Sequence, residues 1–461
     1  MVHFDAIVVG GGSAGYAAAR SLVAGGARTA VVDGARELGG LCILRGCMPT
    51  KALLHAAELR QSIRDAVHWG IDAGTVKVDP QRLFARKNTL IEDFAGFRRQ
   101  QLSDGRFELF RSAAWFTGPN TLALADGQSL HAPHFVIATG SVLTPSLVPG
   151  MEEAGFWTSD TALLERPFPR SLIVLGGGAV ALEFAQFFAR MGTRVTLIQR
   201  GNQLLSEADP DVATALESAF QREGIEVITG TQLDRVVRDS GGVRVLFRQG
   251  ETLREVVAEE LFSGLGRRPN TDGLGLDAAG VQLEGQRIRV DLNQKTSTPS
   301  VYAAGDCCGP HEIVHLAIRQ GEVAASNILN KRAAMDYRVL LGVVFTEPQV
   351  AWVGLTERTA TQQGVEVRIA SYPFNDHGKS MILGAQEGFV KLLADPKTGE
   401  LLGGACVGPQ GGELIHEIAV ALSARMTAAQ LAAVPHYHPT LAEIWTYPAE
   451  ELAEQCGPEV N

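Results

Sequence analysis

The chain has 461 residues, of which 51 are glycine and 6 are cysteine, and its formal charge is −10. This length favours about three domains, and the hydrophobic share of 45% excludes a disordered chain. The low cysteine content excludes a disulfide scaffold and favours a reducing compartment, while the acidic balance argues against a nucleic-acid partner.

Neither a leader nor a membrane segment is expected. The chain opens on Val2-His3-Phe4-Asp5 and runs straight into an apolar strand. The most apolar stretch, residues 172–182, is interrupted by glycines and is too short to span a membrane. We therefore expect a cytoplasmic protein with no membrane partner.

A strand, a glycine-rich turn, a helix and a second strand are predicted first. The apolar run 6–9 leads into Gly10-x-Gly12-x-x-Gly15, a helix pattern covers 16–24, and the strand 29–33 ends in an acid. Such a turn brings backbone N–H groups to a pyrophosphate at a helix N-terminus, and the acid accepts ribose hydroxyls. A plain tight turn is the alternative. The expected dinucleotide contacts are Gly10, Gly12, Ser13, Ala14, Gly15 and Asp33.

Two cysteines follow, Cys42 and Cys47, separated by four residues and placed just before a helical stretch over 52–64. A zinc site would need a further Cys or His pair, and none lies nearby, so no metal site is predicted. Two buried core cysteines are the structural alternative, which the flanking glycines disfavour. A helix N-terminus with Lys51 or Arg45 nearby favours a thiolate, so we predict a redox-active dithiol.

The strand–turn–helix–strand pattern returns over residues 172–198, with a helix expected at 179–191. Its last strand ends in Gln199-Arg200 where an acid is usual for NADH. An arginine there attracts a 2′-phosphate, so the pattern favours NADPH; the alternative is that Arg200 only faces solvent. The small residues of this turn are Gly176, Gly178 and Ala181.

Beyond about residue 336, strands such as 340–345 and 388–393 alternate with helical stretches and no nucleotide-type turn. The predicted fold is therefore α/β, with two doubly wound, Rossmann-like nucleotide-binding domains and an α+β C-terminal domain.

The run Gly-Gly-x-Cys-x4-Cys-x-Pro-Thr-Lys resembles the redox-active disulfide of the pyridine nucleotide–disulfide oxidoreductases. That family includes dihydrolipoamide dehydrogenase, glutathione reductase and mercuric reductase, and the resemblance covers essentially the whole chain. Four further motifs carry it: a crossover segment at 138–140, a return at 266–270, a second flavin motif at 301–306 and a C-terminal base motif at 436–443.

The resemblance implies bound FAD and a flavin-facing thiolate at Cys47. Cys42 would then be the interchange thiol that attacks the substrate disulfide, and Lys51 would lie near the flavin and pair with Glu183. Asp306 would bind the ribityl chain. Other cofactor contacts are implied at Gly40, Lys51, Thr139, Gly140, Gly266 and Glu183.

The resemblance also implies a general base, His438, which keeps Cys42 deprotonated, and Glu443, which orients the imidazole. In this family the base comes from the partner subunit, so we expect a homodimer with an active site shared across the interface. The implied domains are an FAD domain at 1–150 and 269–335, an NAD(P) domain at 151–268 and a dimerisation domain at 336–461.

The expected reaction passes electrons between a nicotinamide coenzyme, the flavin and the Cys42–Cys47 disulfide. The base motif looks most like dihydrolipoamide dehydrogenase, whereas the coenzyme site looks like the NADPH enzymes. Mercuric or other metal-ion reduction and glutathione-type reduction stay open, as does a non-catalytic flavoprotein subunit. The sequence leaves the roles of Arg45, Cys307, Cys308 and Cys456 open.

Overall fold

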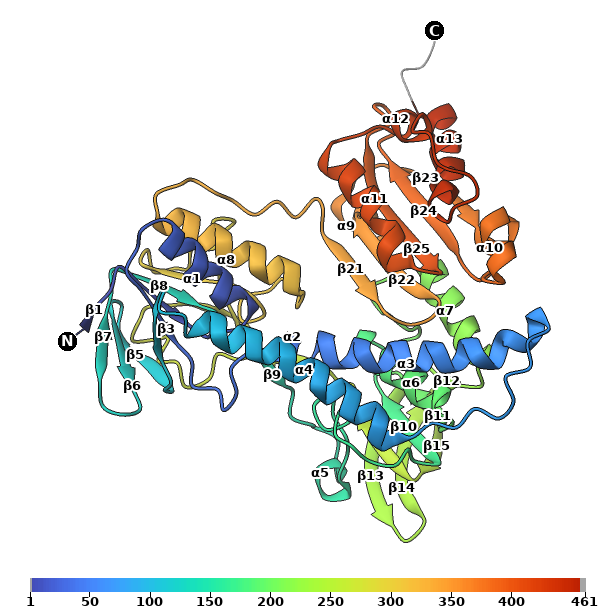
Figure 1. The fold of residues 1–461 in the computed structure, drawn as a ribbon, viewed down its shortest axis with the longest axis horizontal. Coiled ribbons are helices and arrows are strands. Elements are labelled where there is room, and N and C mark those ends of the chain that lie inside the picture. The colour runs from blue at the N-terminus through green and yellow to red at the C-terminus, as the bar shows by residue number, and fades with distance from the viewer. Residues whose placement is uncertain (1, 457–461) are drawn as a thin grey trace. The chain divides into compact units, whose positions relative to one another are not determined.

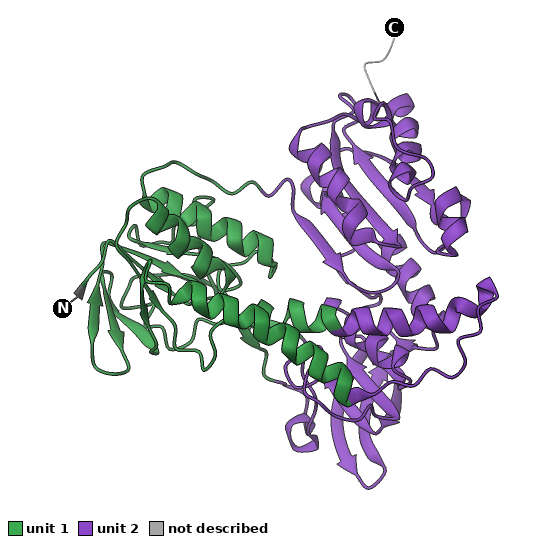
Figure 2. Cartoon of the chain, viewed as in Figure 1, with its two compact units in different colours: residues 1–52, 81–145, 266–336 green, residues 53–80, 146–265, 337–461 purple. Residues whose placement is uncertain are grey.

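A computed structural model describes residues 2–456. The chain forms two compact units, one made of residues up to 52, 81–145 and 266–336, and the other of 53–80, 146–265 and the residues from 337 on (Figure 2). The first unit contains the first nucleotide turn and both cysteines of the predicted dithiol. The second contains the second nucleotide turn together with the C-terminal region, so the three-domain division stays a prediction.

A five-stranded parallel sheet forms the centre of the first unit, in the order β20 (Val301–Ala303), β8 (His134–Ile137), β2 (Ala6–Val9), β3 (Thr29–Val32), β4 (Glu108–Phe110). Strands β2 and β3 are buried throughout, as continuous apolar runs in a parallel sheet require. Helices α1 (Ser13–Ala24) and α8 (Val314–Ile328) pack side by side (Figure 1). Gly321 allows this contact, because a Cβ there would overlap the Ala14 carbonyl oxygen.

The first unit holds three smaller sheets and further helices. The sheets are β1 (Val2–His3), β7 (Ser129–His131), β6 (Thr121–Leu124) and β5 (Ala114–Gly118); β17 (Arg267–Pro269) with β9 (Ser141–Leu143); and β18 (Leu283–Glu284) with β19 (Arg287–Ile288). The helices are α2 (Leu41–Leu44), the first turns of α3 (Cys47–Asp65), and α4 (Pro80–Leu102) except for its first residue.

In the second unit, a four-stranded parallel sheet carries the second nucleotide turn, in the order β12 (Glu226–Ile228), β11 (Arg194–Ile198), β10 (Ser171–Leu175), β16 (Glu260–Ser263). Helix α6 (Ala179–Arg190) packs on β10 and β11. The accompanying elements are α5 (Met151–Ala154), α7 (Pro210–Arg222), β13 (Thr231–Asp239), β14 (Gly242–Gln249), β15 (Thr252–Ala258) and the 3₁₀ turn η1 (Ala66–Trp69).

The C-terminal part of this unit is an antiparallel sheet covered by helix α11 (Gly411–Ser423). Its strand order is β21 (Leu341–Val344), β22 (Gln349–Gly354), β25 (Leu401–Gly408), β24 (Phe389–Ala394), β23 (Arg368–Pro373). The remaining elements are α9 (Glu357–Gln363), η2 (Phe374–Asp376), α10 (Gly378–Leu383), α12 (Ala428–Ala432), η3 (Ala442–Trp445) and α13 (Thr446–Gln455). This part is the α+β arrangement expected after about residue 336.

One boundary differs from the sequence prediction in a way that matters for the dithiol. The helix expected over 52–64 already begins at Cys47. Pro49 lies inside its first turn, which is tolerated because the N–H groups at a helix N-terminus have no partner within the helix. Cys47 is therefore the first residue of a long helix and does not precede it.

Candidate functional site

The first nucleotide turn joins β2 to α1. Gly10 has a φ of +105°, and a Cβ at Gly15 would overlap the Gly10 carbonyl oxygen. Helix α1 begins directly after Gly12, and no side chain caps its N-terminus. The unpaired N–H groups there can bind a pyrophosphate. The Gly11 N–H donates a 2.8 Å hydrogen bond to Asp33 Oδ2, which ties the turn to the acid that follows the second strand.

The segment that leads into α2 and Cys42 lies against this turn. Gly40 has a φ of +77°, and a Cβ there would lie 2.8 Å from Gly12 Cα. A side chain at Gly40 would push the two loops apart, so glycine permits the close approach. A dinucleotide seated on the turn would thus lie beside the loop that carries Cys42.

The two cysteines of the predicted dithiol are close together. Cys42 lies in α2, and a Cβ at Gly46 would lie 3.2 Å from Cys42 Cα, so the glycine lets the next helix begin beside it. A hydrogen bond with Cys47 and burial raise the pKa of the Cys42 thiol. The N-terminus of α3 stabilises a thiolate at Cys47. The geometry therefore favours a protonated Cys42 beside an ionised Cys47.

Lys51 lies one helical turn beyond Cys47 on α3, on the same face of the helix. Its positive charge acts to lower the pKa of Cys42, against the larger effects of the Cys47 hydrogen bond and burial. Arg45 is exposed, and its role, which the sequence left open, stays open.

Asp306 is connected to the crossover strands through one serine. Ser141 Oγ donates a 2.7 Å hydrogen bond to Asp306 Oδ2 and accepts a 3.0 Å bond from Arg267 Nε. Thr139 Oγ1 donates to the Asn270 carbonyl oxygen, and the Asn270 amide donates back to the Thr139 carbonyl oxygen. Sequence reasoning missed Ser141, whose only signal is its position directly after the crossover motif.

Three glycines of these motifs lie in the left-handed region of backbone space. The φ values are +69° at Gly140, +103° at Gly266 and +83° at Gly305. Gly140 and Gly266 directly precede the paired strands β9 and β17. A Cβ at Gly305 would lie 3.2 Å from Ala14 Cβ, so the second flavin motif approaches the first nucleotide turn.

The second nucleotide turn repeats the first. Gly176 has a φ of +112°, and α6 begins directly after Gly178 with no side-chain cap. A Cβ at Gly264 would lie 2.7 Å from Ala181 Cβ, so residue 181 must be small for the helix to pack closely. This turn also presents unpaired N–H groups to an anion.

Gln199 occupies the position that Asp33 has in the first unit. Each is the first residue after the second strand, and a Cβ on Gly177 would lie 2.8 Å from the Gln199 side chain, just as a Cβ on Gly11 would from Asp33 Oδ2. The second turn is thus neutral where the first is acidic. Arg200 follows Gln199 and is exposed.

Glu183 is buried on α6, with 3% of its surface exposed. Its Oε1 atom accepts a 3.0 Å hydrogen bond from the Phe345 N–H. One turn on, Gln186 accepts a 2.7 Å bond from the Glu347 N–H. The helix therefore anchors the segment after β21, a role for Glu183 that the sequence did not predict. Lys51 lies in the other unit, so its pairing with Glu183 stays a prediction.

His438 and Glu443 form the pair expected from the C-terminal motif. His438 Nδ1 lies 2.9 Å from Glu443 Oε2, the His438 side chain is 78% exposed, and that of Glu443 is 13% exposed. The carboxylate holds the Nδ1 proton, so Nε2 is the nitrogen that can take a proton from a thiol. A second histidine that sequence reasoning missed, His377, is fully buried with Nε2 3.4 Å from Glu443 Oε1.

His436, the other histidine of the motif, is bonded elsewhere. Its Nε2 atom lies 2.6 Å from Glu417 Oε1 on α11, and its side chain is only 8% exposed. The motif therefore contains one exposed histidine and one histidine held in the fold.

The remaining cysteines are spread over both units. Cys307 and Cys308 are buried in the core of the first unit, and their Sγ atoms bond backbone carbonyl oxygens. The hydrogen bond with Cys307 and burial raise the pKa of Cys308. Burial raises the pKa of Cys406 and of the partly buried Cys456. These four thiols form no disulfide in the described part of the chain.

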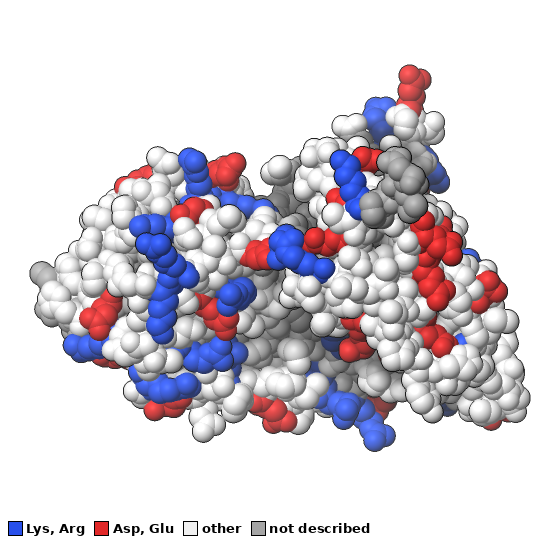
Figure 3. All heavy atoms as spheres, turned by 90° about the horizontal axis from the view of Figure 1, so that it is seen from above, with Lys and Arg blue, Asp and Glu red and all other residues white. Residues whose placement is uncertain are grey.

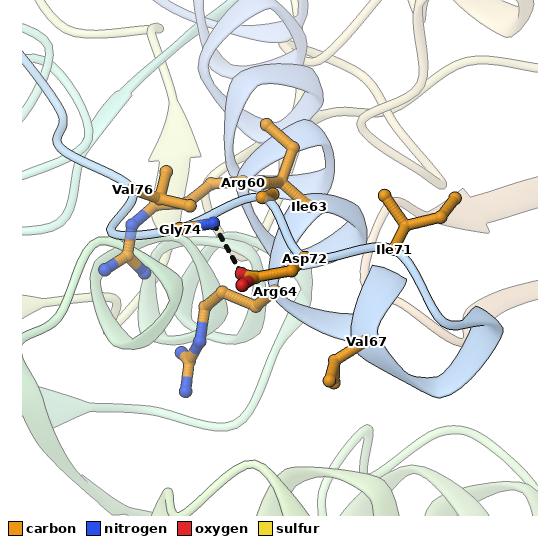
Figure 4. Close-up of a pocket in the computed structure, with 9 residues that line it drawn as sticks. Arg60, Ile63, Arg64, Val67, Ile71, Asp72, Gly74 and Val76 are labelled. Atoms are coloured by element: carbon orange, nitrogen blue, oxygen red, sulfur yellow. Dashed lines mark hydrogen bonds between the residues drawn. The ribbon is translucent and has the colours of Figure 1, made fainter.

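A cavity of about 310 Å³ lies beside the second half of α3, between Arg60, Arg64 and the loop that follows η1 (Figure 4). The Gly74 N–H donates a 2.9 Å hydrogen bond to Asp72 Oδ1, which closes this loop. None of the predicted site residues lines the cavity.

On the molecular face drawn in Figure 3, acidic and basic side chains are interspersed. Within residues 2–456, no helix combines the length and hydropathy of a membrane span.

Comparison with known proteins gives a consistent picture. The profile "Pyridine nucleotide-disulphide oxidoreductase" matches residues 4–321, and the dimerisation-domain profile of the same family matches residues 341–449. The chain is 39% identical to the dihydrolipoyl dehydrogenase of Thermus scotoductus over 461 residues, covering 99% of each chain. It is 36% identical to that of Chlorobaculum tepidum, covering 99% of this chain and 98% of the relative.

Two solved structures are also similar. The crystal structure of LpdA from Mycobacterium tuberculosis has a TM-score of 0.86 at 28% identity, covering 98% of this chain and 100% of the other. The HOCl-induced flavoprotein disulfide reductase RclA from Escherichia coli has a TM-score of 0.86 at 23% identity, covering 97% and 99%. The second likeness shows the fold alone.

Proposed function

The chain belongs to the pyridine nucleotide-disulphide oxidoreductase family, and from this we propose that it oxidises a dihydrolipoyl dithiol with a nicotinamide coenzyme. It is an FAD-dependent disulfide oxidoreductase similar to dihydrolipoyl dehydrogenases. In the proposed direction, the substrate dithiol becomes a disulfide, two electrons and one proton reach the coenzyme as a hydride, and the second proton is released.

The residues of the first unit suit FAD. The uncapped N-terminus of α1 offers N–H groups to its pyrophosphate, and Asp33 lies beside the turn to accept ribose hydroxyls. Asp306, held by Ser141, is available to the ribityl chain. When bound, FAD accepts an electron pair from the dithiol and passes it on as hydride.

The observation that carries the proposal is the Cys42–Cys47 pair at the start of α3. We assign Cys47 as the thiolate that faces the flavin, because the helix N-terminus stabilises its charge. We assign Cys42 as the thiol that exchanges with substrate, because its raised pKa means that it needs a base before it can attack. The Lys51–Glu183 ion pair is proposed to neutralise charge beside the flavin.

His438 is the proposed base, with Glu443 fixing its tautomer. Its imidazole is 78% exposed in the single chain, as a base offered to another subunit would be. We therefore propose a homodimer in which His438 serves the Cys42 of the partner subunit. The family's dimerisation domain at 341–449 supports this assembly.

For the coenzyme, we propose NADP(H) in preference to NAD(H). An acid at the end of the second strand repels a 2′-phosphate, and here that position holds the neutral Gln199 with Arg200 after it. Because the Arg200 guanidinium is exposed, a phosphate can reach it without any rearrangement of the fold.

A cytoplasmic location stays a prediction.

Turnover with purified holoenzyme tests the function. We expect reduction of NADP⁺ by dihydrolipoamide, no turnover in Cys42→Ser, and full turnover in Cys456→Ser, whose thiol lies far along the chain in α13's C-cap. NADPH oxidation by glutathione disulfide or Hg(II), without any dihydrolipoamide oxidation, would reject the lipoyl substrate. Absence of turnover with all three would instead favour a non-catalytic flavoprotein subunit.

A further inference from the structure

Glu443 is approached by two histidines, one on each carboxylate oxygen. His438 Nδ1 lies 2.9 Å from Oε2, and His377 Nε2 lies 3.4 Å from Oε1. His438 is exposed, whereas His377 is fully buried at the junction of η2 and α10. The proposed base pair therefore has a third member on its buried side.

The hydrogen bonds of His377 decide which ring nitrogen carries the proton. Its Nδ1 atom lies 2.7 Å from the hydroxyl oxygen of Ser380, which is itself fully buried. When that hydroxyl donates to Nδ1, the ring proton is on Nε2 and is aimed at Glu443. Among the described residues no hydrogen bond satisfies Nε2, so the Glu443 oxygen is its available acceptor.

His377 is neutral near neutral pH. Burial lowers its pKa, and this effect exceeds the opposing influence of Glu443. Two aromatic rings lie beside the His377 imidazole. Tyr447 packs edge-on against it with ring centroids 6.4 Å apart, and Tyr372 stacks on Tyr447 with ring centroids 4.0 Å apart. Tyr372 donates to Asp376 Oδ2, and its pKa is raised to about 12 by burial and this carboxylate, so it stays neutral too.

We propose that His377 is a positioning residue for the thiol base: its Nε2–H holds one oxygen of Glu443 and leaves the other for His438. This inference rests on the proposed function of His438. A neutral donor on Oε1 draws negative charge away from Oε2, so Glu443 orients His438 without stabilising its protonated form too strongly. At 3.4 Å the contact is longer than an ordinary hydrogen bond, which agrees with a modest electrostatic influence on Glu443.

Loss of the His377 donor should change the pH dependence of turnover. Without the His377 donor, the full charge of Glu443 acts on His438 and favours an imidazole that keeps its proton. The base is then protonated over a wider range at acid pH, where it cannot accept the Cys42 proton. If His377 only filled space, its replacement would change stability but would not shift the acid side of the pH–rate profile.

The experiment is the pH profile of kcat/KM for dihydrolipoamide oxidation by the holoenzyme, from about pH 5.5 to about pH 9. In His377→Leu, which keeps the volume but removes the donor, we expect the acid limb to move up by about half a pH unit, a loss of about threefold on that limb. His377→Gln restores an N–H donor and should restore the original profile. The matched control is His436→Gln, a buried histidine paired with a different carboxylate, which should leave the limb in place.

An acid limb that does not move in folded His377→Leu overturns the inference. If that variant does not fold, Ser380→Ala takes its place, because loss of the hydroxyl lets the ring proton leave Nε2. The limb should move in the same direction, and an unchanged limb again overturns the inference. His438→Gln separates the two proposals: normal turnover there would refute the base itself, whereas loss of turnover with an unmoved limb in His377→Leu refutes only the role of His377.

Discussion

Glu443 Oε2 lies 2.9 Å from His438 Nδ1, and this contact joins a shielded carboxylate to an exposed imidazole. The carboxylate fixes the proton on Nδ1, so Nε2 is left as the basic nitrogen. A carboxylate that orients a histidine in this way is a common arrangement for a general base in enzymes.

We expect Glu443→Gln to lower kcat for dihydrolipoamide oxidation by about 10²-fold, because an amide can hold the wrong tautomer of His438. Steady-state rates of the folded variant measure this. The control is Glu417→Gln, which removes the carboxylate bonded to His436 and should change kcat by less than about twofold. Equal losses in both variants would mean that Glu443 acts through the fold.

The two thiols should separate spectroscopically. Because the pKa of Cys42 is raised by its hydrogen bond with Cys47 and by burial, we expect Cys47 to be the thiolate beside the flavin. In NADPH-reduced enzyme we expect long-wavelength absorbance from this thiolate next to the flavin. Cys42→Ser cannot form the disulfide, so it should show the band before any reductant is added, while its flavin is oxidised, and Cys47→Ser should lack the band in both states. A band that survives only in Cys47→Ser would reverse the two roles.

Coenzyme preference should depend on the residues after β11. We expect Arg200→Ala to lower kcat/KM for NADPH about tenfold and to change that for NADH less than about twofold. Gln199→Glu should shift preference further toward NADH, because the new charge repels a 2′-phosphate. Arg194→Ala, at the exposed start of the same strand, is the control. A preference unchanged by Arg200→Ala would mean that Arg200 only faces solvent.

A buried lysine should contribute several kcal/mol to the unfolding free energy of the second unit. Lys391 Nζ lies 2.9 Å from Asp209 and Asp211 and 2.6 Å from Glu357, with 2% of its side chain exposed. Burial opposes its charge, but the hydrogen bonds that the ammonium donates to these carboxylates outweigh burial and raise its pKa. We expect Lys391→Met to cost about 3 kcal/mol of unfolding free energy, because it leaves the buried Asp209 carboxylate without a cation, while Asp211 and Glu357 are partly exposed.

Denaturant unfolding measures this loss, and Lys397→Met on the exposed loop after β24 should change stability by less than about 0.5 kcal/mol. Since the folded-state pKa of Lys391 is raised, its contribution is complete below about pH 10 and is lost only as the pH rises through the folded-state value. A Lys391→Met loss that disappears at neutral pH would contradict this linkage.

Residues close in sequence were the ones the sequence predicted well. The spacing from His438 to Glu443 is five residues, and the structure shows them hydrogen-bonded. Cys42 and Cys47 are likewise close in sequence, at the end of α2 and the start of α3, and a hydrogen bond between them helps to raise the pKa of Cys42. Both pairs depend on local backbone geometry, which motif spacing carries. The start of α3 was missed because a proline normally indicates a break, whereas here it occupies the first turn.

Contacts between distant segments could not be predicted. Ser141 links Asp306 and Arg267, which lie 165 and 126 residues away along the chain. His377 meets Glu443 only because η2, α10 and η3 come together in the tertiary fold. A serine after a crossover and a lone histidine before a short helix have no periodicity or motif, so only the packing shows what they contact.

The most direct measurement is a count of reactive thiols before and after anaerobic reduction of the holoenzyme by one equivalent of NADPH. If electrons are stored in a Cys42–Cys47 disulfide, the natural chain should gain two thiols per chain on reduction, and Cys42→Ser should gain none, because a hydride equivalent opens one disulfide into two thiols. An unchanged thiol count in the natural chain, with the flavin reduced, would contradict the account.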